Sequence, residues 1–109
     1  MDEKLIKKYC PMTETIFYTL LALLEPNHGY GIMKFVKELT EERVKLGTGT
    51  LYTMLGRLVE DQMIIVIKEV DGKKTYHITD VGREILLMEQ ERLMQQVENG
   101  KKILGGTTL

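Results

Sequence analysis

The spacing of the apolar residues changes from the period of a helix to that of a strand, and this change limits the folds open to the chain. Across residues 51–59 they recur at i, i+3, i+4, i+7 and i+8, which predicts a helix with one buried stripe. Residues 63–70, MIIVIKEV, are instead rich in β-branched side chains. Asp71-Gly72 is a strong hairpin signal, and residues 75–78 return as a second strand. The sequence therefore predicts a helix followed directly by a β-hairpin.

An earlier helix is predicted to open at Pro11, because the first helical position needs no N–H donor. Thr13 or Thr15 is able to cap its first turn. Residues 16–25, IFYTLLALLE, are apolar nearly all round, so more than one partner must cover this helix. A chain of this size has few layers for that purpose. We favour a subunit contact for part of this helix over a purely intramolecular core.

A second helix is predicted over residues 30–40, after a break at residues 25–29 that contains proline and glycine. Its predicted buried stripe is formed by Ile32, Phe35, Val36 and Leu39. Residues 43–46 alternate polar and apolar side chains like a very short strand. Gly47 or Thr48 then caps the helix that carries residues 51–59, and the Thr48 hydroxyl is able to accept a free N–H.

The last long element is a helix from about Asp80 to Glu98, capped by Thr79 and stopped by Asn99-Gly100. The order helix, helix, short strand, helix, hairpin, helix predicts a mainly α fold with a small β-hairpin (α+β). This order matches a winged helix-turn-helix followed by a C-terminal helix. We divide the chain into an N-terminal arm (1–11), the winged helix-turn-helix domain (12–79), the C-terminal helix (80–104) and a flexible tail (105–109).

The composition excludes several classes of protein. A length of 109 residues with 43% hydrophobic side chains fits one globular domain. No apolar run approaches the roughly 20 residues of a membrane span, and no secretory signal is visible, so we expect a cytoplasmic protein without a membrane partner. A single cysteine, Cys10, excludes an internal disulfide. Because no catalytic motif or metal-ligand spacing is present, we expect neither an enzyme nor a cofactor or metal site.

The net charge of −1 argues against a protein that binds nucleic acid through a generally basic surface. Any basic surface must therefore be local. Between Arg43 and Val59 the charged residues are Arg43, Lys45 and Arg57, with no carboxylate among them. The acids gather near the first helix, at Glu41 and Glu42, and along the last helix. This distribution keeps DNA possible as a partner.

The face opposite the apolar stripe of residues 51–59 is small and hydroxylated. It presents Gly49, Thr53, Gly56, Arg57 and Glu60, with Thr50 and Tyr52 beside them. Such a face suits a helix that enters the DNA major groove, where small residues allow close approach and hydroxyls bind phosphates. Tyr52 is either a phosphate contact or an aromatic ring that only packs. Arg57 is either a phosphate contact or a solvated charge. Lys45, which precedes the helix, is a further phosphate candidate.

Three stretches of the chain resemble the PadR-like family of bacterial transcriptional regulators. They are LLALLEPNHGYGIMKFVKEL, GTGTLYTMLGRLVEDQMI and DGKKTYHITDVGREIL. The length and the single terminal helix resemble the short subfamily. The resemblance implies a dimeric winged-helix repressor that is often relieved by a small molecule, here a small hydrophobic or aromatic effector. It further implies that the helix containing GTLY lies in the major groove and that the basic wing reaches the flanking backbone.

Carried onto this chain, the resemblance assigns the DNA contacts of the groove to Thr48, Gly49, Thr50, Tyr52 and Thr53, and those of the wing to Lys73, Lys74 and Tyr76. The resemblance also implies a C-terminal dimerisation helix (80–104), so we expect the first and last helices to form the dimer interface, through Ile16, Phe17, Leu20, Leu86, Leu93, Met94 and Val97. Two positions depart from the family pattern. Thr48 stands where many relatives have proline, and Gln62 stands where glycine is common. A left-handed Gln62 carries strain on the order of 1–2 kcal/mol.

The sequence thus predicts a homodimeric, sequence-specific DNA-binding regulator that acts as a repressor relieved by an effector. The alternative is a winged-helix module that binds another protein and not DNA. The near-neutral charge and the acidic terminal helix motivate this alternative.

Overall fold

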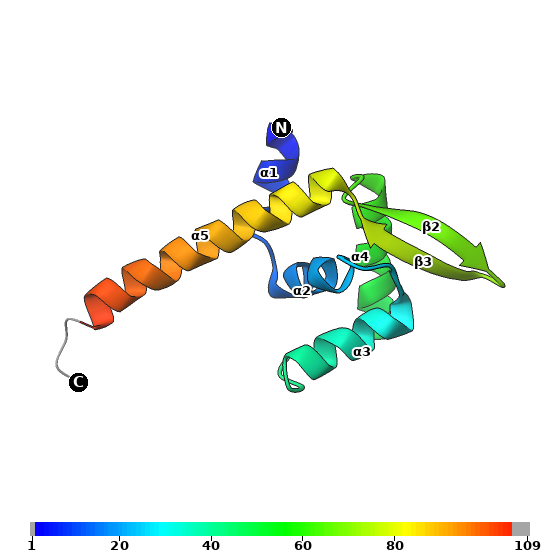
Figure 1. Ribbon diagram of the computed structural model, residues 1–109, viewed down its shortest axis with the longest axis horizontal. Helices are drawn as coiled ribbons and strands as arrows, with labels where there is room; N and C mark the ends of the chain where they lie inside the picture. The colour runs from blue at the N-terminus through cyan, green and yellow to red at the C-terminus, as the bar shows by residue number, and fades with distance from the viewer. Residues whose placement is uncertain (1, 106–109) are drawn as a thin grey trace.

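The computed structural model describes residues 2–105 and contains helices and a hairpin in the expected order (Figure 1). Its elements are α1 (Glu3–Tyr9), α2 (Glu14–Ala22), β1 (Asn27–His28), α3 (Gly29–Leu39), α4 (Thr48–Glu60), β2 (Ile64–Val70), β3 (Lys73–Ile78) and α5 (Asp80–Leu104). The fold is mainly helical, with a small antiparallel sheet of order β1-β3-β2. Within the described range, no helix is both long and apolar enough to cross a membrane.

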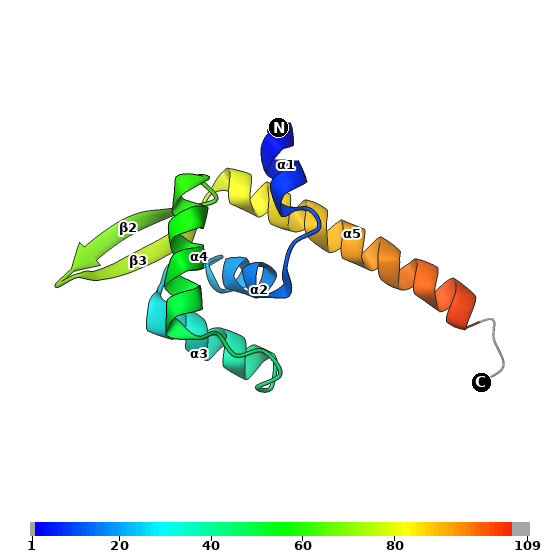
Figure 2. The ribbon, with the colours of Figure 1, turned by 180° about the vertical axis from the view of Figure 1, so that it is seen from behind.

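The helix α4 lies at the centre of the arrangement. Seen from behind, it has the hairpin on one side and α1 and α2 on the other (Figure 2). The helix α5 leaves this body on the side away from the hairpin, which gives the molecule extents of 59 × 34 × 21 Å (Figure 1). A long helix that projects from a small body leaves much of its length without intramolecular cover.

The predicted apolar stripe of α4 forms the middle of the core. Leu51, Leu55 and Leu58 are at most 1% exposed, and Met54 is 8% exposed. Fully buried side chains of α2 and its C-cap, of α3 and of α5 belong to the same core, namely Leu20, Leu23, Ile32, Val36 and Ile85. Because the stripe of α4 is buried, its opposite face is the one that remains at the surface.

The N-terminal arm is a helix, and the prediction that Pro11 opens the next helix is wrong. Asp2 caps α1 by accepting the N–H groups of Lys4 and Leu5. Pro11 follows a cis peptide bond in the linker, and α2 begins at Glu14. Its cap is the first of the two expected threonines, whose hydroxyl accepts the Ile16 N–H.

The short strand predicted at residues 43–46 is also wrong, because these residues form an irregular loop. Val44 and Leu46 alternate with exposed neighbours because both are buried in the core from this loop. The Thr40 hydroxyl accepts the Val44 N–H at 3.0 Å. In a strand this N–H would be bonded to the neighbouring strand instead. The extra strand is instead β1, which pairs with β3 at Tyr76 and Thr75.

The helix α3 buries a narrower stripe than the sequence indicated. Ile32 and Val36 are fully buried, whereas Phe35 is 38% and Leu39 is 53% exposed. Glu41 and Glu42, both left-handed, end the helix region, and the Glu42 N–H bonds the Lys37 carbonyl at 2.8 Å.

The junction of α4, the hairpin and α5 is built around Thr79. Its hydroxyl caps α5 by accepting the Gly82 N–H at 3.0 Å, and it lies 2.7 Å from the Gln62 carbonyl, to which it donates. An added Cβ at Gly82 would meet the Met63 carbonyl oxygen, so only glycine allows this approach. Gln62, which stands where glycine is common in the family pattern, is left-handed with φ of 59° and carries a strain of about 1–2 kcal/mol.

The helix α5 continues past the predicted stop. Gly100 retains a helical backbone, and the helix runs for 25 residues to Leu104 with Gly105 as its C-cap. The rest of the predicted tail, residues 106–109, lies outside the described residues.

A buried carboxylate joins α5 to the linker between α1 and α2. Glu89 is 0% exposed. It accepts the Met12 N–H at 3.0 Å and two hydrogen bonds from Arg92 at 2.7 and 2.8 Å. The Arg92 guanidinium, together with the Met12 N–H, holds the pKa of Glu89 below its ordinary value.

We expect Glu89→Gln to lower the free energy of unfolding by about 1–3 kcal/mol, because the charged pair with Arg92 is lost. A carboxyl whose pKa folding lowers stabilises the protein above its ordinary pKa, and this stability is lost as the pH falls through the lowered value. The difference between wild type and variant is therefore largest near neutral pH and shrinks below pH 4.5. Urea unfolding across pH measures it. Glu91→Gln, at an exposed position on α5, is the control, and an equal effect of both variants would contradict the role of Glu89.

Candidate nucleic-acid interface

The exposed face of α4 is bare along its middle and hydroxylated at its start. Each of the α4 residues proposed as a DNA contact is exposed, namely Thr48, Gly49, Thr50, Tyr52, Thr53 and Arg57. A Cβ added at Gly49 or Gly56 would have no atom within 4 Å. Glu60 is the one carboxylate within the helix. A ligand is therefore able to approach the backbone of α4 closely.

The N-terminus of α4 has no side-chain cap. Gly47, one of the two residues expected to cap this helix, is the N-cap residue, whereas Thr48 is the first helical residue and its hydroxyl does not provide the cap. The Leu51 N–H bonds the Gly47 carbonyl at 2.9 Å, which leaves the preceding N–H groups without a partner inside the helix. Uncapped N–H groups and the helix dipole favour an anion at this end.

Tyr52 lies between the start of α3 and the hairpin. An added Cβ at Gly29 would be 2.7 Å from the Tyr52 Cζ, so the ring lies directly on the α3 backbone. With Lys73, Lys74 and Tyr76, this ring also lines a cleft of about 250 Å³. Because Tyr52 is still 49% exposed, it both supports the wing and stands at the surface.

The wing presents two lysines beside its turn. Asp71 and Gly72 have φ of 51° and 77°, as a two-residue hairpin turn requires. Lys73 and Lys74 follow and are both exposed, paired across the hairpin with Val70 and Glu69. Asp71 in the turn and Glu69 opposite Lys74 offset the charge of the tip as a whole, but two exposed ammonium groups on a projecting hairpin are still suited to contacts with single phosphates.

Tyr76 does not belong to this exposed set, and its assignment as a DNA contact stays a prediction. It is only 6% exposed in the central strand, and burial raises the pKa of its hydroxyl. It lines one cleft together with Tyr52 and Lys74, and its burial in the central strand helps to hold the wing on the body.

Lys45 belongs to a second cluster of basic side chains, which the sequence did not predict. Together with Lys34 and Lys37 of α3 and the 69% exposed Tyr30, it lines a shallow cleft of about 430 Å³. Lys37 and Lys45 both lie near Glu42, at 3.8 and 3.7 Å, which offsets part of their charge. The signal available in the sequence was that Lys34 and Lys37 fall off the buried stripe of α3.

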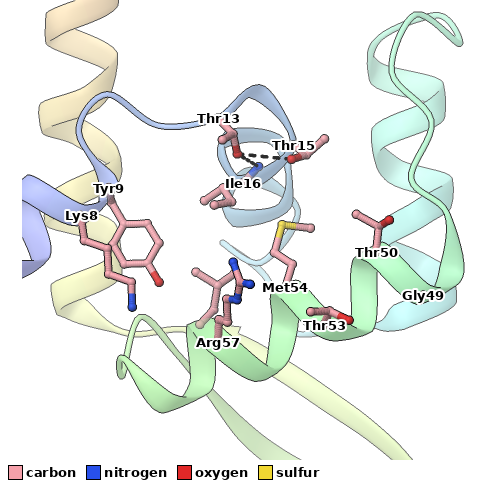
Figure 3. Close-up of a pocket in the computed structure, with 11 residues that line it drawn as sticks. Lys8, Tyr9, Thr13, Thr15, Ile16, Gly49, Thr50, Thr53, Met54 and Arg57 are labelled. Carbon is pink, nitrogen blue, oxygen red and sulfur yellow. Dashed lines mark hydrogen bonds between the residues drawn. The ribbon is translucent and has the colours of Figure 1, made fainter.

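Arg57 stands on the opposite flank of α4 from Tyr52. It points into a cleft bordered by α1 and the start of α2 (Figure 3). Lys8, on α1, borders the same cleft and was missed because the arm gave no sign of packing here. Basic groups therefore lie on both flanks of the small face of α4.

The residues proposed for the dimer interface separate into three groups. Leu20 and Leu86 are 0% and 4% exposed inside one protomer, so they belong to the core and their assignment to the interface is wrong. Ile16 borders the cleft beside Arg57. The remaining four line an apolar groove of about 460 Å³ between α2 and α5, namely Phe17, Leu93, Met94 and Val97.

Comparison with known proteins decides the family. Residues 17–87 match the family described as "Transcriptional regulator PadR-like family". The chain belongs to this family. PadR-like proteins are transcriptional regulators and not enzymes, in agreement with the sequence analysis. The family match and the winged-helix fold together make this chain a PadR-like regulator.

Curated relatives are longer than this chain. The transcriptional regulator YqjI of Escherichia coli is 28% identical over 85 residues, which cover 78% of this chain and 41% of the relative. An uncharacterized 37.1 kDa protein in a transposon of Streptomyces fradiae is 34% identical over 64 residues, which cover 59% and 18%. The chain thus spans less than half the length of the curated relatives it matches.

Solved structures share the fold along nearly the whole chain. A PadR family regulator from Eggerthella lenta has a TM-score of 0.70 at 21% identity and covers 95% of this chain and 88% of its own. A PadR-like regulator from Bacillus cereus has a TM-score of 0.68 at 20% identity, with 96% and 100% covered. These similarities establish the PadR fold, including the long C-terminal helix.

We expect Gly29→Ala to lower the free energy of unfolding by about 1–3 kcal/mol, because the new methyl group displaces the Tyr52 ring. Adding Tyr52→Phe removes the nearest atom and restores part of the loss. The control Gly49→Ala meets no atom and raises stability by up to about 1 kcal/mol through helix propensity. Urea midpoints at one protein concentration measure all three. If Gly29→Ala is equally destabilising with and without Tyr52→Phe, the contact between Gly29 and the Tyr52 ring is contradicted.

Proposed function

We propose that this PadR-like regulator is a homodimer that binds DNA sequence-specifically and represses transcription until a small effector releases it. The observation that supports this proposal is the exposed face of α4. The helix has no side-chain cap at its start, and basic groups lie on both flanks of this face. Major-groove entry needs a helix with a bare, hydroxylated tip, and phosphate binding needs cations beside it.

In the proposed complex α4 lies in the major groove. Thr48, Gly49, Thr50 and Thr53 face the bases and nearest phosphates, and Tyr52 stands at the edge of the groove. The wing lysines contact the flanking backbone. We expect Lys45 to contact a further phosphate, with Lys34 and Lys37 of α3 beside it. The short side chains of α4 favour recognition by shape and by dimer spacing over a long series of base contacts.

The proposed dimer forms through α5. Met94 and Val97 are 60% and 55% exposed, and both border the apolar groove that Phe17 closes from α2. A second copy of this helix would cover these side chains. The symmetric dimer then presents two α4 helices to successive major grooves, about 34 Å apart. An effector that changes their tilt or spacing lowers DNA affinity and relieves repression. A hydrophobic or aromatic effector suits a chain whose apolar surfaces are rich in methionine.

One observation favours a protein-binding module as the second candidate. Strand β2 lies at the edge of the sheet, and Ile65, Ile67 and Val70 are each about half exposed. An apolar edge strand is able to pair with another chain. A gel-shift assay at low salt, using DNA from upstream of the protein's own gene, separates the candidates. A specific shift supports the regulator, and no shift with the purified dimer supports the module.

We expect the double variant Lys73→Ala, Lys74→Ala to bind DNA more weakly and with a shallower salt dependence. If each lysine neutralises one phosphate, the slope of log K against log salt falls by about 2. The control is Lys101→Ala, Lys102→Ala, which removes the same charge from the far end of α5 and leaves the slope unchanged. Titrations by fluorescence anisotropy at several salt concentrations measure the slopes. Identical slopes for wild type and the wing variant would remove the wing from the mechanism.

We expect Val97→Glu to raise the dimer dissociation constant about 100-fold, because an unpaired carboxylate would be buried between the subunits. Val70→Glu is the matched control, since that valine is similarly exposed but lies at the end of β2. Sedimentation equilibrium measures both. A wild-type protein that is monomeric at micromolar concentration would refute the dimer.

A further inference from the structure

A large cleft lies beside α4, on the flank away from the wing. It has a volume of about 790 Å³ and is bordered by α1, the start of α2 and α4 (Figure 3). Its apolar floor is formed by Ile16, Met54 and Leu58, and threonine hydroxyls line its rim. Ligand pockets in proteins commonly have volumes of about 300–1,000 Å³ and combine an apolar lining with a few polar groups.

One positive charge in this cleft has no ion-pair or hydrogen-bond partner in the part of the chain that the structure describes. The Lys8 ammonium lies 2.6 Å from an Asp61 oxygen that also accepts the Tyr9 hydroxyl at 2.5 Å. Arg57 makes no ion pair or hydrogen bond among residues 2–105, and Figure 3 shows its guanidinium in the space between Tyr9 and Met54. None of the residues that line the cleft is acidic. The cleft therefore offers one unpaired cation above an apolar floor.

The walls of the cleft are in place before any ligand arrives. Tyr9 is 4% exposed and bonded to Asp61 at the end of α4, which positions α1. The linker that follows α1 is bonded to the buried Glu89 through the Met12 N–H. A site that is already ordered does not have to be ordered at the moment of binding, so less of the interaction energy is lost.

We propose that this cleft binds a small amphipathic monoanion, with an apolar body on the Met54 floor and a carboxylate or sulfonate on Arg57. A planar guanidinium binds such a group through two parallel hydrogen bonds. A methionine floor adapts to apolar bodies of different shape. The charge count supports one anionic group and not two, because the Lys8 ammonium is already paired.

The same residues connect the cleft to DNA binding, and this step rests on the proposed function. Thr50, Thr53 and Arg57 line the cleft and belong to the exposed face of α4. A bound anion would occupy the space that a phosphate needs and would cancel the charge that attracts it. Ligand and DNA then exclude each other directly, without a change in the tilt of α4.

The test uses the full-length protein and two fluorescent probes of matched shape. These are 1-anilinonaphthalene-8-sulfonate, which is an anion, and N-phenyl-1-naphthylamine, which lacks the sulfonate. We expect Arg57→Gln to weaken binding of the anionic probe about tenfold and to leave the neutral probe within about twofold. Thr53→Phe, which fills the cleft and keeps the charge, weakens both probes. The control Lys102→Gln, at the end of α5, changes neither.

Equal binding of the anionic probe by wild type and Arg57→Gln would overturn the proposal, as would an equal loss in the Lys102→Gln control. A second arm adds the anionic probe to the protein–DNA complex, where saturation of the cleft raises the apparent DNA dissociation constant. Probe binding at Arg57 without any DNA binding would refute the proposed function and leave the cleft as a ligand site. If Arg57→Gln weakens DNA alone, the cleft is a backbone contact and the proposal fails.

Discussion

The position of α4 depends on a buried carboxylate that lies on a different helix. Glu89 of α5 is completely buried and accepts hydrogen bonds from the Met12 N–H and from Arg92. A buried charge is tolerated only where such partners satisfy it, so separating the linker from α5 would leave a carboxylate short of donors. The linker is thereby held on α5, and α1 with it. Tyr9 and Lys8 carry this connection on to Asp61, the residue that ends α4.

A second connection reaches the same end of α4 from the start of α5. The Thr79 hydroxyl joins the Gln62 carbonyl to the first turn of α5, and Gly82 allows that turn to lie against Met63. With two separate attachments, α4 has little freedom to tilt relative to α5. In a dimer formed through α5, the spacing of the two α4 helices is then a property of the folded protomer. An effector that works through tilt must break one of these attachments, whereas an anion in the Arg57 cleft need not.

The features that the sequence predicted are those with a local signal. The stripe from Leu51 to Leu58, the Asp71-Gly72 turn and the Thr79 cap each depend on neighbours in the chain. Strand β1 was missed because its two residues are a strand only through pairing with β3. What covers each apolar face was harder to predict from the sequence, because periodicity shows which face of an element is apolar but not whether the same protomer or a second subunit covers it. Leu20, Leu86 and Tyr76 were therefore placed at interfaces, although the protomer itself buries them.

A net charge of −1 is compatible with DNA binding because of where the charges lie. Several acids are already paired, such as Glu14 with Arg43 and Asp61 with Lys8, or are buried like Glu89. The remaining cations near α4 are few, and each phosphate contact they make contributes a separable share of affinity. Arg57 is one of the six cations proposed to contact DNA, with Lys34, Lys37, Lys45, Lys73 and Lys74. A monoanion on Arg57 would therefore remove only part of the electrostatic attraction, and it would also occupy the space that a phosphate needs beside α4.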